Sequence, residues 1–166
     1  MEIRKLTILS FLVALTVALE QVMQFLPNIQ LTTLLIVLIS TKFDRKSIVL
    51  AIITYVLLDN ILGGFGVHTP SMFVAWIGFS LLIHYLKDKN EFVLAIVSLV
   101  FAIIYAVLLA IPTILLLKVD PLVYLMADIP FTAIFMLVNF LTVLWLFQPL
   151  AKMFDVIQTE IYDIHK

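Results

Sequence analysis

Long apolar runs, separated by short polar stretches, divide the chain into six segments. They are 6–25, 28–40, 47–62, 71–86, 92–117 and 122–147, each bounded by charged residues, proline or glycine. Such runs are typical of membrane-spanning helices, because a helix needs about 20 apolar residues to cross the hydrocarbon core. The pattern predicts an all-α integral membrane protein, a six-transmembrane-helix bundle that forms a single domain over 1–166.

The second segment, 28–40, is short for a span. Its thirteen residues rise only about 20 Å as a helix, against a hydrocarbon core of about 30 Å. We expect this helix to continue into its flanks, to tilt little, or to be sheltered by its neighbours.

The stretch after the sixth segment, 148–166, is amphipathic. Apolar residues recur at helical spacing from Leu150 to Ile161, with charged residues such as Lys152 and Glu160 between them. This pattern predicts a cytoplasmic amphipathic tail that lies at the membrane surface, with a dedicated docking peptide as the alternative.

Lysine and arginine are distributed unevenly between the connections. With both termini cytoplasmic, the outer side holds only Lys118 of the ten basic residues. The inner side holds Arg4, Lys5, Lys42, Arg45, Lys46, Lys87, Lys89, Lys152 and Lys166. Because the positive-inside rule counts basic residues in short flanks, this split predicts six spans with both termini in the cytoplasm.

Composition narrows the classes of function. The chain is 64% hydrophobic and 13% charged, so lipid must be its solvent. A net charge of -1 argues against a nucleic-acid partner, and the lack of cysteine excludes disulfides and thiolate chemistry. The first apolar run has no small-residue cleavage site after it, which indicates a retained helix rather than a signal peptide.

A polar bend joins the third and fourth segments. Three of the four glycines, Gly63, Gly64 and Gly66, lie here beside His68 and Thr69. Backbone freedom and hydrogen-bonding groups therefore coincide at the outer membrane edge.

Three carboxylates, Glu20, Asp59 and Asp128, lie inside apolar spans, each in the outer third. A charged group costs about 2.5–3.5 kcal/mol at the centre of a span and less near an interface, so something must compensate it. Random placement would scatter these acids between leaflets. Their common depth predicts a shared polar cavity open to the outside.

Other polar residues and one tryptophan lie at or just below the same level, and we expect a substrate-binding pocket there. Its expected members are Glu20, Gln24, Asn28, Asp59, Asn60, His68, Trp76 and Asp128. Trp76 is expected to stack on a ligand ring. Taken singly these residues have structural alternatives, for example Trp76 and Trp145 as interface anchors, His84 as a snorkelling group and Asn139 as an interhelical hydrogen bond.

The sixth span carries one polar stripe. Its members follow i, i+4, i+7, i+11 and i+14 and are Asp128, Thr132, Phe135, Asn139 and Thr142. Residues at this spacing share one helix face, which we expect to face the bundle interior.

The first span has a stripe of small residues on the face opposite Glu20. Thr7, Ser10, Ala14 and Ala18 lie on it. Small residues let helices approach closely, so this face predicts either self-packing or contact with a partner.

Taken together, these features resemble the substrate-binding S components of energy-coupling factor (ECF) transporters, which capture vitamins. The resemblance rests on six spans in about 170 residues, the Ala14/Ala18 pair, the run Leu-Pro-Asn-Ile-Gln-Leu at 26–31 and the run Leu-Leu-Asp-Asn at 57–60 followed by two glycines.

The resemblance implies a capture subunit that works with a transmembrane coupling subunit and two ATP-binding cassette ATPases. Ala14 and Ala18 would contact the coupling subunit. The subunit would topple in the membrane, with the outer loops as gates. The sequence has no phosphate-binding loop, so partners would use the ATP, and we expect no catalytic residue, resident metal or cofactor in this chain.

The ligand and two other functional classes stay open at this point. Acids, amides and an aromatic ring suit a cationic or donor-rich molecule, and cobalamin-type compounds, pyridoxine or pyrimidine precursors and pantothenate are candidates, pantothenate fitting least well. A scaffolding protein of the MreD type and a proton-coupled carrier are the alternatives. For a serine protease, no serine and histidine form a convincing pair.

Overall fold

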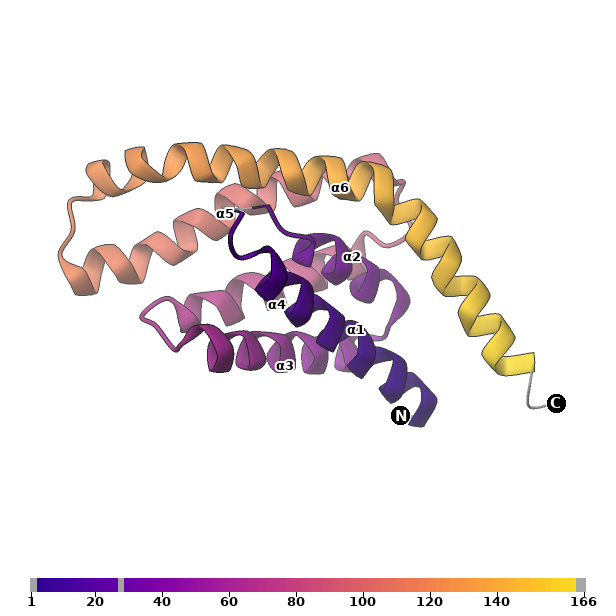
Figure 1. Ribbon diagram of the computed structural model, residues 1–166. Coiled ribbons are helices and arrows are strands. Elements are labelled where there is room, and N and C mark those ends of the chain that lie inside the picture. Colours follow the sequence, from indigo (N-terminus) through magenta and orange to yellow (C-terminus); the bar gives the residue numbers. More distant parts are fainter. Residues whose placement is uncertain (1–2, 27–28, 164–166) are drawn as a thin grey trace.

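The computed structural model describes residues 3–26 and 29–163, with backbone alone over 158–163, and these residues form six helices and no strand (Figure 1). The helices are α1 (Ile3–Met23), α2 (Thr32–Lys42), α3 (Arg45–Gly63), α4 (Thr69–Tyr85), α5 (Glu91–Leu117) and α6 (Pro121–Asp163). Within the described residues, α1, α3, α5 and α6 are long and apolar enough to cross a membrane, while α2 and α4 are shorter. The prediction of an all-α membrane bundle is confirmed.

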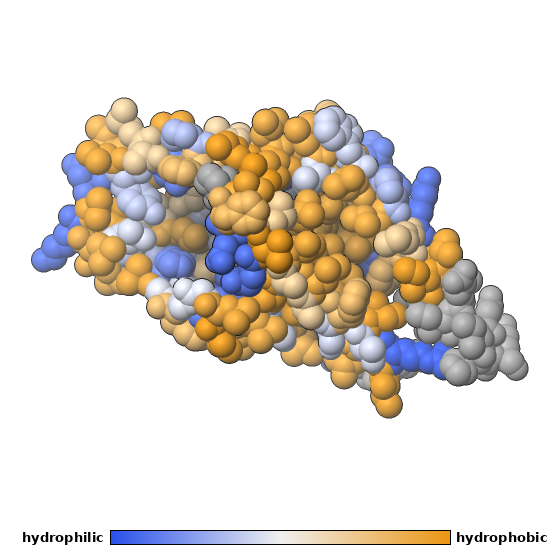
Figure 2. Space-filling view, in the orientation of Figure 1, coloured by the Kyte–Doolittle hydropathy of each residue, from blue (hydrophilic) through white to orange (hydrophobic). Residues whose placement is uncertain are grey.

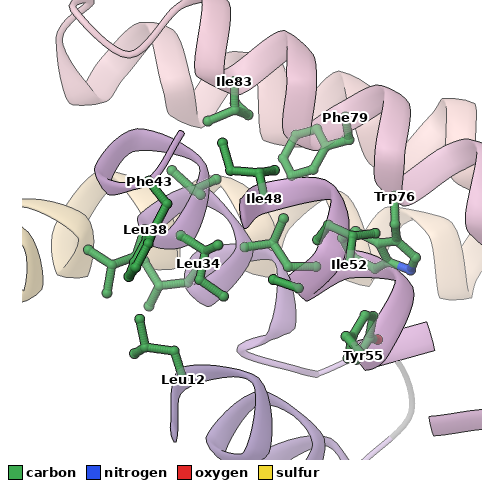
Figure 3. Close-up of a cluster of buried hydrophobic side chains, with 14 of the residues drawn as sticks. Leu12, Leu34, Leu38, Phe43, Ile48, Ile52, Tyr55, Trp76, Phe79 and Ile83 are labelled. Atoms are coloured by element: carbon green, nitrogen blue, oxygen red, sulfur yellow. The ribbon is translucent and has the colours of Figure 1, made fainter. Parts of the chain in front are cut away.

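The short helix α2 lies in the middle of the bundle. Every residue from Thr32 to Ser40 is buried, and α2 packs against α1, α3, α4 and α6. A helix that is apolar on all sides is expected to be surrounded by protein or lipid. Of the three possibilities for this short segment, shelter by its neighbours is therefore the correct one. Figure 3 shows Leu34 and Leu38 of α2 among side chains of the neighbouring helices, such as Ile48 and Ile52 of α3.

The amphipathic tail predicted for 148–166 is continuous with the sixth helix. α6 runs through Pro130 and Pro149 as far as Asp163 and bends toward its C-terminal part (Figure 1). Proline removes a backbone hydrogen bond and is a common cause of such bends. The inner face of this part packs on the bundle, since Phe154 is buried with its ring centroid 5.8 Å from that of Phe43, while Lys42 forms an ion pair with Asp155 at 2.6 Å.

One end of the bundle gathers the basic connections, and we call it the basic end. The start of α1 meets the α2–α3 connection there through an ion pair between Lys5 and Asp44. Asp44 also caps α3 by accepting from the backbone N–H of Ser47 at 3.2 Å. The hydrogen bonds from Lys5 and Ser47 hold the pKa of the Asp44 carboxyl well below its usual range. Since these groups are partly exposed, the contacts add only modest stability and serve mainly to fix the register of the connection.

The opposite end, which we call the glycine end, contains the α3–α4 connection. Asn60 joins its two sides: its Nδ2 donates to the Val56 carbonyl at 2.8 Å, and its Oδ1 accepts from Thr69 Oγ1 at 2.5 Å. Thr69 Oγ1 in turn accepts from the backbone N–H of Gly66 at 3.0 Å. The bend is therefore a hydrogen-bonded turn with a defined shape.

Gly64 holds a conformation in which a side chain is strained, with φ of 97° and ψ of 140°. We expect Gly64→Ala to destabilise the protein by about 1–3 kcal/mol, because this region of backbone space is nearly restricted to glycine. Thermal unfolding in detergent measures the loss. Gly63→Ala is the matched control, since Gly63 ends α3 and a Cβ there meets no atom within 4 Å. Equal effects of the two substitutions would contradict this explanation.

Candidate functional site

Glu20, near the end of α1, forms hydrogen bonds to two neighbouring helices. Its Oε2 accepts from the Tyr55 hydroxyl of α3 at 2.5 Å and from Thr32 Oγ1 of α2 at 2.9 Å. Its Oε1 has no hydrogen-bond partner among the described residues. One oxygen thus holds the carboxylate in place, and the other is not bonded within the described structure.

Asp59 lies beside Glu20 at the glycine end. Its Oδ1 accepts from Gln21 Nε2 of α1 at 3.3 Å. The carboxylates of Glu20 and Asp59 are close enough to repel each other, whereas the half-buried His68 attracts Asp59. The structure therefore brings together three of the predicted site residues, Glu20, Asp59 and His68.

Asp128 lines a separate small cavity between α5, α6 and the α1–α2 connection, which we call the Asp128 pocket. Its volume is about 150 Å³ and its lining is Gln30, Tyr105, Ala106, Leu109, Tyr124, Asp128, Thr132 and Phe135. Asp128 Oδ2 accepts from Thr132 Oγ1 at 2.6 Å. On the face shown in Figure 2, the surface is hollowed at the glycine end, between α1, α6 and the α3–α4 connection, with hydrophilic side chains at and inside the hollow.

The predicted stripe on α6 does face the interior. Phe135 and Asn139 are buried and Asp128 is half-buried, whereas Ile129 and Leu137 on the other side are exposed. Among the structural alternatives, Asn139 Nδ2 does form an interhelical hydrogen bond, to the Ser98 carbonyl at 3.4 Å. His84 bonds across helices too, with its Nδ1 3.0 Å from the Ser40 carbonyl.

Tyr105 connects the acidic pair with the Asp128 pocket. Its ring centroid lies 5.3 Å from that of Trp76 and 5.8 Å from that of Phe135. It lines the pocket and lies within electrostatic range of both Glu20 and Asp59. Asp128 and Tyr105 line this pocket, whereas neither Glu20 nor Asp59 does, so the single cavity predicted for the three acids is not found at this pocket. Within the described part of the chain, no three acidic or imidazole groups converge as they would on one metal ion.

Each of the three carboxylates uses only one oxygen within the described structure. Glu20 Oε2, Asp59 Oδ1 and Asp128 Oδ2 are hydrogen-bonded, and their second oxygens have no partner there. None of the three forms an ion pair with a described lysine or arginine. These second oxygens are not among the buried side-chain atoms that lack a partner, so water or a ligand can reach them.

Trp76 differs from its predicted role. The indole is 1% exposed and is enclosed by the rings of Tyr55, Phe79, Phe101 and Tyr105 at centroid distances of 5.8, 6.1, 4.9 and 5.3 Å. No face of the indole is left for a ligand to stack on. Trp76 is therefore a packing residue next to the site. Its Nε1 is buried without a hydrogen-bond partner in the described structure, and Figure 3 shows this nitrogen at the end of the ring nearer Tyr55.

The remaining predicted residues have other positions. Asn60 is 3% exposed and its amide is committed to the α3–α4 bend, so in this structure it orders the bend and has no group free for a ligand. Gln24 is exposed just after the end of α1. Asn28 lies outside the described residues.

The sequence interpretation missed the tyrosines, Tyr55, Tyr105 and Tyr124. Two of them have a recognisable signal, because Tyr55 precedes Asp59 by four residues and Tyr124 precedes Asp128 by four. Residues at i and i+4 share a helix face, so each tyrosine lies on the side of its acid. Tyr105 is in a plain apolar run, and only the packing of α5 against α4 and α6 reveals its position.

The small-residue face of α1 is open. Thr7, Ser10, Ala14 and Ala18 are all exposed, as required of a face that contacts a partner. Ser10 and Ala14 also line an apolar groove of about 240 Å³ between α1 and α3.

Comparison with known proteins adds no family to this description. No protein-family model, curated protein or solved structure matches the chain significantly.

Proposed function

We propose that this protein is the membrane-embedded substrate-capture subunit of an ECF-type importer, which binds a water-soluble vitamin or vitamin precursor at the glycine end. The observation that carries the proposal is the gathering of half-buried carboxylates toward the glycine end, where Glu20 and Asp59 lie near each other and Asp128 lines a pocket with Tyr105. Acids are costly within membrane-spanning segments, so their gathering at one end of the bundle favours a binding site for a polar molecule. In this proposal, donors of the captured molecule bond to these carboxylates.

In this proposal the glycine end faces the outside of a prokaryotic plasma membrane and the basic end faces the cytoplasm, as the positive-inside rule requires. A transmembrane coupling subunit and two ATP-binding cassette ATPases complete the importer. The chain itself binds no ATP and carries out no reaction. Its contribution is the affinity and selectivity of the pocket.

The experiment that tests this proposal begins with purification in lipid nanodiscs. Mass spectrometry of the released small molecules is expected to find a vitamin or precursor, and calorimetry over a panel of such compounds is expected to give saturable binding. Absence of binding across the whole panel would oppose the proposal. Tolerance of both Asp59→Ala and Asp128→Ala in an uptake assay would favour a scaffolding protein, and uptake driven by a pH gradient without ATPases would favour a proton-coupled carrier.

The exposed alanines of α1 give a separate prediction. Ala14→Leu and Ala18→Leu are expected to reduce co-purification with the coupling subunit at least about tenfold, because a bulky side chain prevents close helix approach. Ligand binding should be unchanged, since these residues lie on the face opposite Glu20. Ala133→Leu on α6, also exposed, is the matched control. Loss of ligand binding together with the partner would indicate a general folding defect instead.

A further inference from the structure

The Asp128 pocket has the size of one small ring. Its volume is about 150 Å³, and an engineered protein cavity of about this size is known to hold benzene. Tyr105, Tyr124 and Phe135 contribute aromatic rings to the lining. A corrin macrocycle is far too large for this space, whereas one aromatic ring fits it.

The electrostatic character of the pocket is negative. Asp128 Oδ1 has no partner in the described structure, and the other polar side chains of the lining, those of Gln30, Thr132 and the two tyrosines, are neutral. Two further carboxylates outside the pocket, those of Glu20 and Asp59, interact electrostatically with Tyr105, and His68 interacts with Asp59. Carboxylates and aromatic faces both favour a cation, the faces through the ring quadrupole.

We infer that the Asp128 pocket takes a single-ring organic cation, with its ring against Tyr105 and Phe135 and its positive group bonded to Asp128 Oδ1. This inference rests on the proposed function and names the chemical class of the captured molecule. Anionic ligands are repelled by three acids, and neutral rings leave the carboxylate unpaired. Of the candidate vitamins, amino-substituted nitrogen heterocycles have this chemistry, whereas pantothenate and cobalamin-type compounds do not.

The two tryptophans supply a reporter for the test. Trp76 contacts Tyr105, which lines the pocket, whereas Trp145 is 65% exposed on the apolar surface of α6. Trp145→Phe in nanodiscs therefore leaves one tryptophan beside the pocket. Three probes with the same ring but different charge are titrated: benzylamine, benzyl alcohol and benzoate. Trp76→Phe, which leaves only Trp145, is the control for probes that merely dissolve in the lipid.

Benzylamine is expected to change Trp76 fluorescence saturably, with a half-saturation at least about tenfold below that of benzyl alcohol, and benzoate should give no saturable change. In Asp128→Asn the preference for the amine should fall to less than about threefold, whereas Asp88→Asn in the α4–α5 connection should keep it. Asparagine can still accept from Thr132, so the helix contact is retained.

Equal or tighter binding of the neutral or anionic probe overturns the inference, as does a preference that survives Asp128→Asn or a lack of any saturable response. The probe series on Trp145→Phe tests the charge preference without altering the pocket. Retention of a neutral or anionic vitamin in the purified protein would overturn the cation while leaving the importer proposal intact. If benzylamine binds selectively but the protein co-purifies from its native membrane with neither a coupling subunit nor an ATPase, the cation stands and the importer proposal is overturned.

Discussion

Glu20→Gln is expected to lower the affinity for a bound cation about 10- to 100-fold while the protein stays folded. The amide oxygen can still accept from Tyr55 and Thr32, the two donors that fix this side chain. What is lost is the negative charge and the vacant Oε1 acceptor. Glu20 does not line the Asp128 pocket, so it attracts the cation through space. At an effective dielectric constant of about 20, opposite charges about 6–11 Å apart attract by about 1.5–3 kcal/mol, which corresponds to that loss in affinity.

Calorimetry with the retained ligand measures this effect, and unfolding temperature checks the fold. Glu91→Gln is the matched control, because Glu91 is a carboxylate at the basic end that bonds to Gln148 at 3.1 Å, far from the glycine end. A large drop in stability with unchanged affinity would show that Glu20 serves only to join α1, α2 and α3.

Much of the fold follows from the sequence, because lipid makes hydropathy decisive. Each apolar segment became a helix, and the basic connections meet at one end, as their charges indicate. The central position of α2 and the unbroken course of α6 through Pro149 were harder to foresee. Both depend on which neighbours cover a segment, and periodicity within one segment carries no such information.

The sequence predicted the depth of the site in the membrane, but only some of the contacts within it. Depth along a helix can be counted from its ends, so Glu20 and Asp59 were expected at one level, and they do interact. The cavity expected to be shared with Asp128 is not found at the Asp128 pocket, which neither of them lines. The direction in which a side chain points depends on the rotation of its helix about its own axis, which depth does not reveal. For this reason the sequence predicted neither the enclosure of Trp76 by four aromatic rings nor the position of Tyr105.

The two roles considered for Asn60 predict different results. The sequence places it among the ligand-binding residues, whereas the structure uses its whole amide in the α3–α4 bend. We expect Asn60→Ala to destabilise the protein by about 1–3 kcal/mol, because the Thr69 hydroxyl then loses its acceptor at a buried position. Thermal or denaturant unfolding in detergent measures the loss.

Thr54→Ala on the same helix is the control, since its hydroxyl bonds only to the Leu50 carbonyl one turn earlier, and its effect should stay within about 0.5 kcal/mol. The double substitution Asn60→Ala with Thr69→Val should cost less than the sum of the single ones, because a valine side chain has no hydroxyl to be satisfied. Ligand affinity measured well below the unfolding temperature should fall far less in Asn60→Ala than in Glu20→Gln. If Asn60→Ala instead lost ligand affinity while its stability stayed intact, Asn60 would be a ligand-binding residue. The bend would then have to open when the ligand binds.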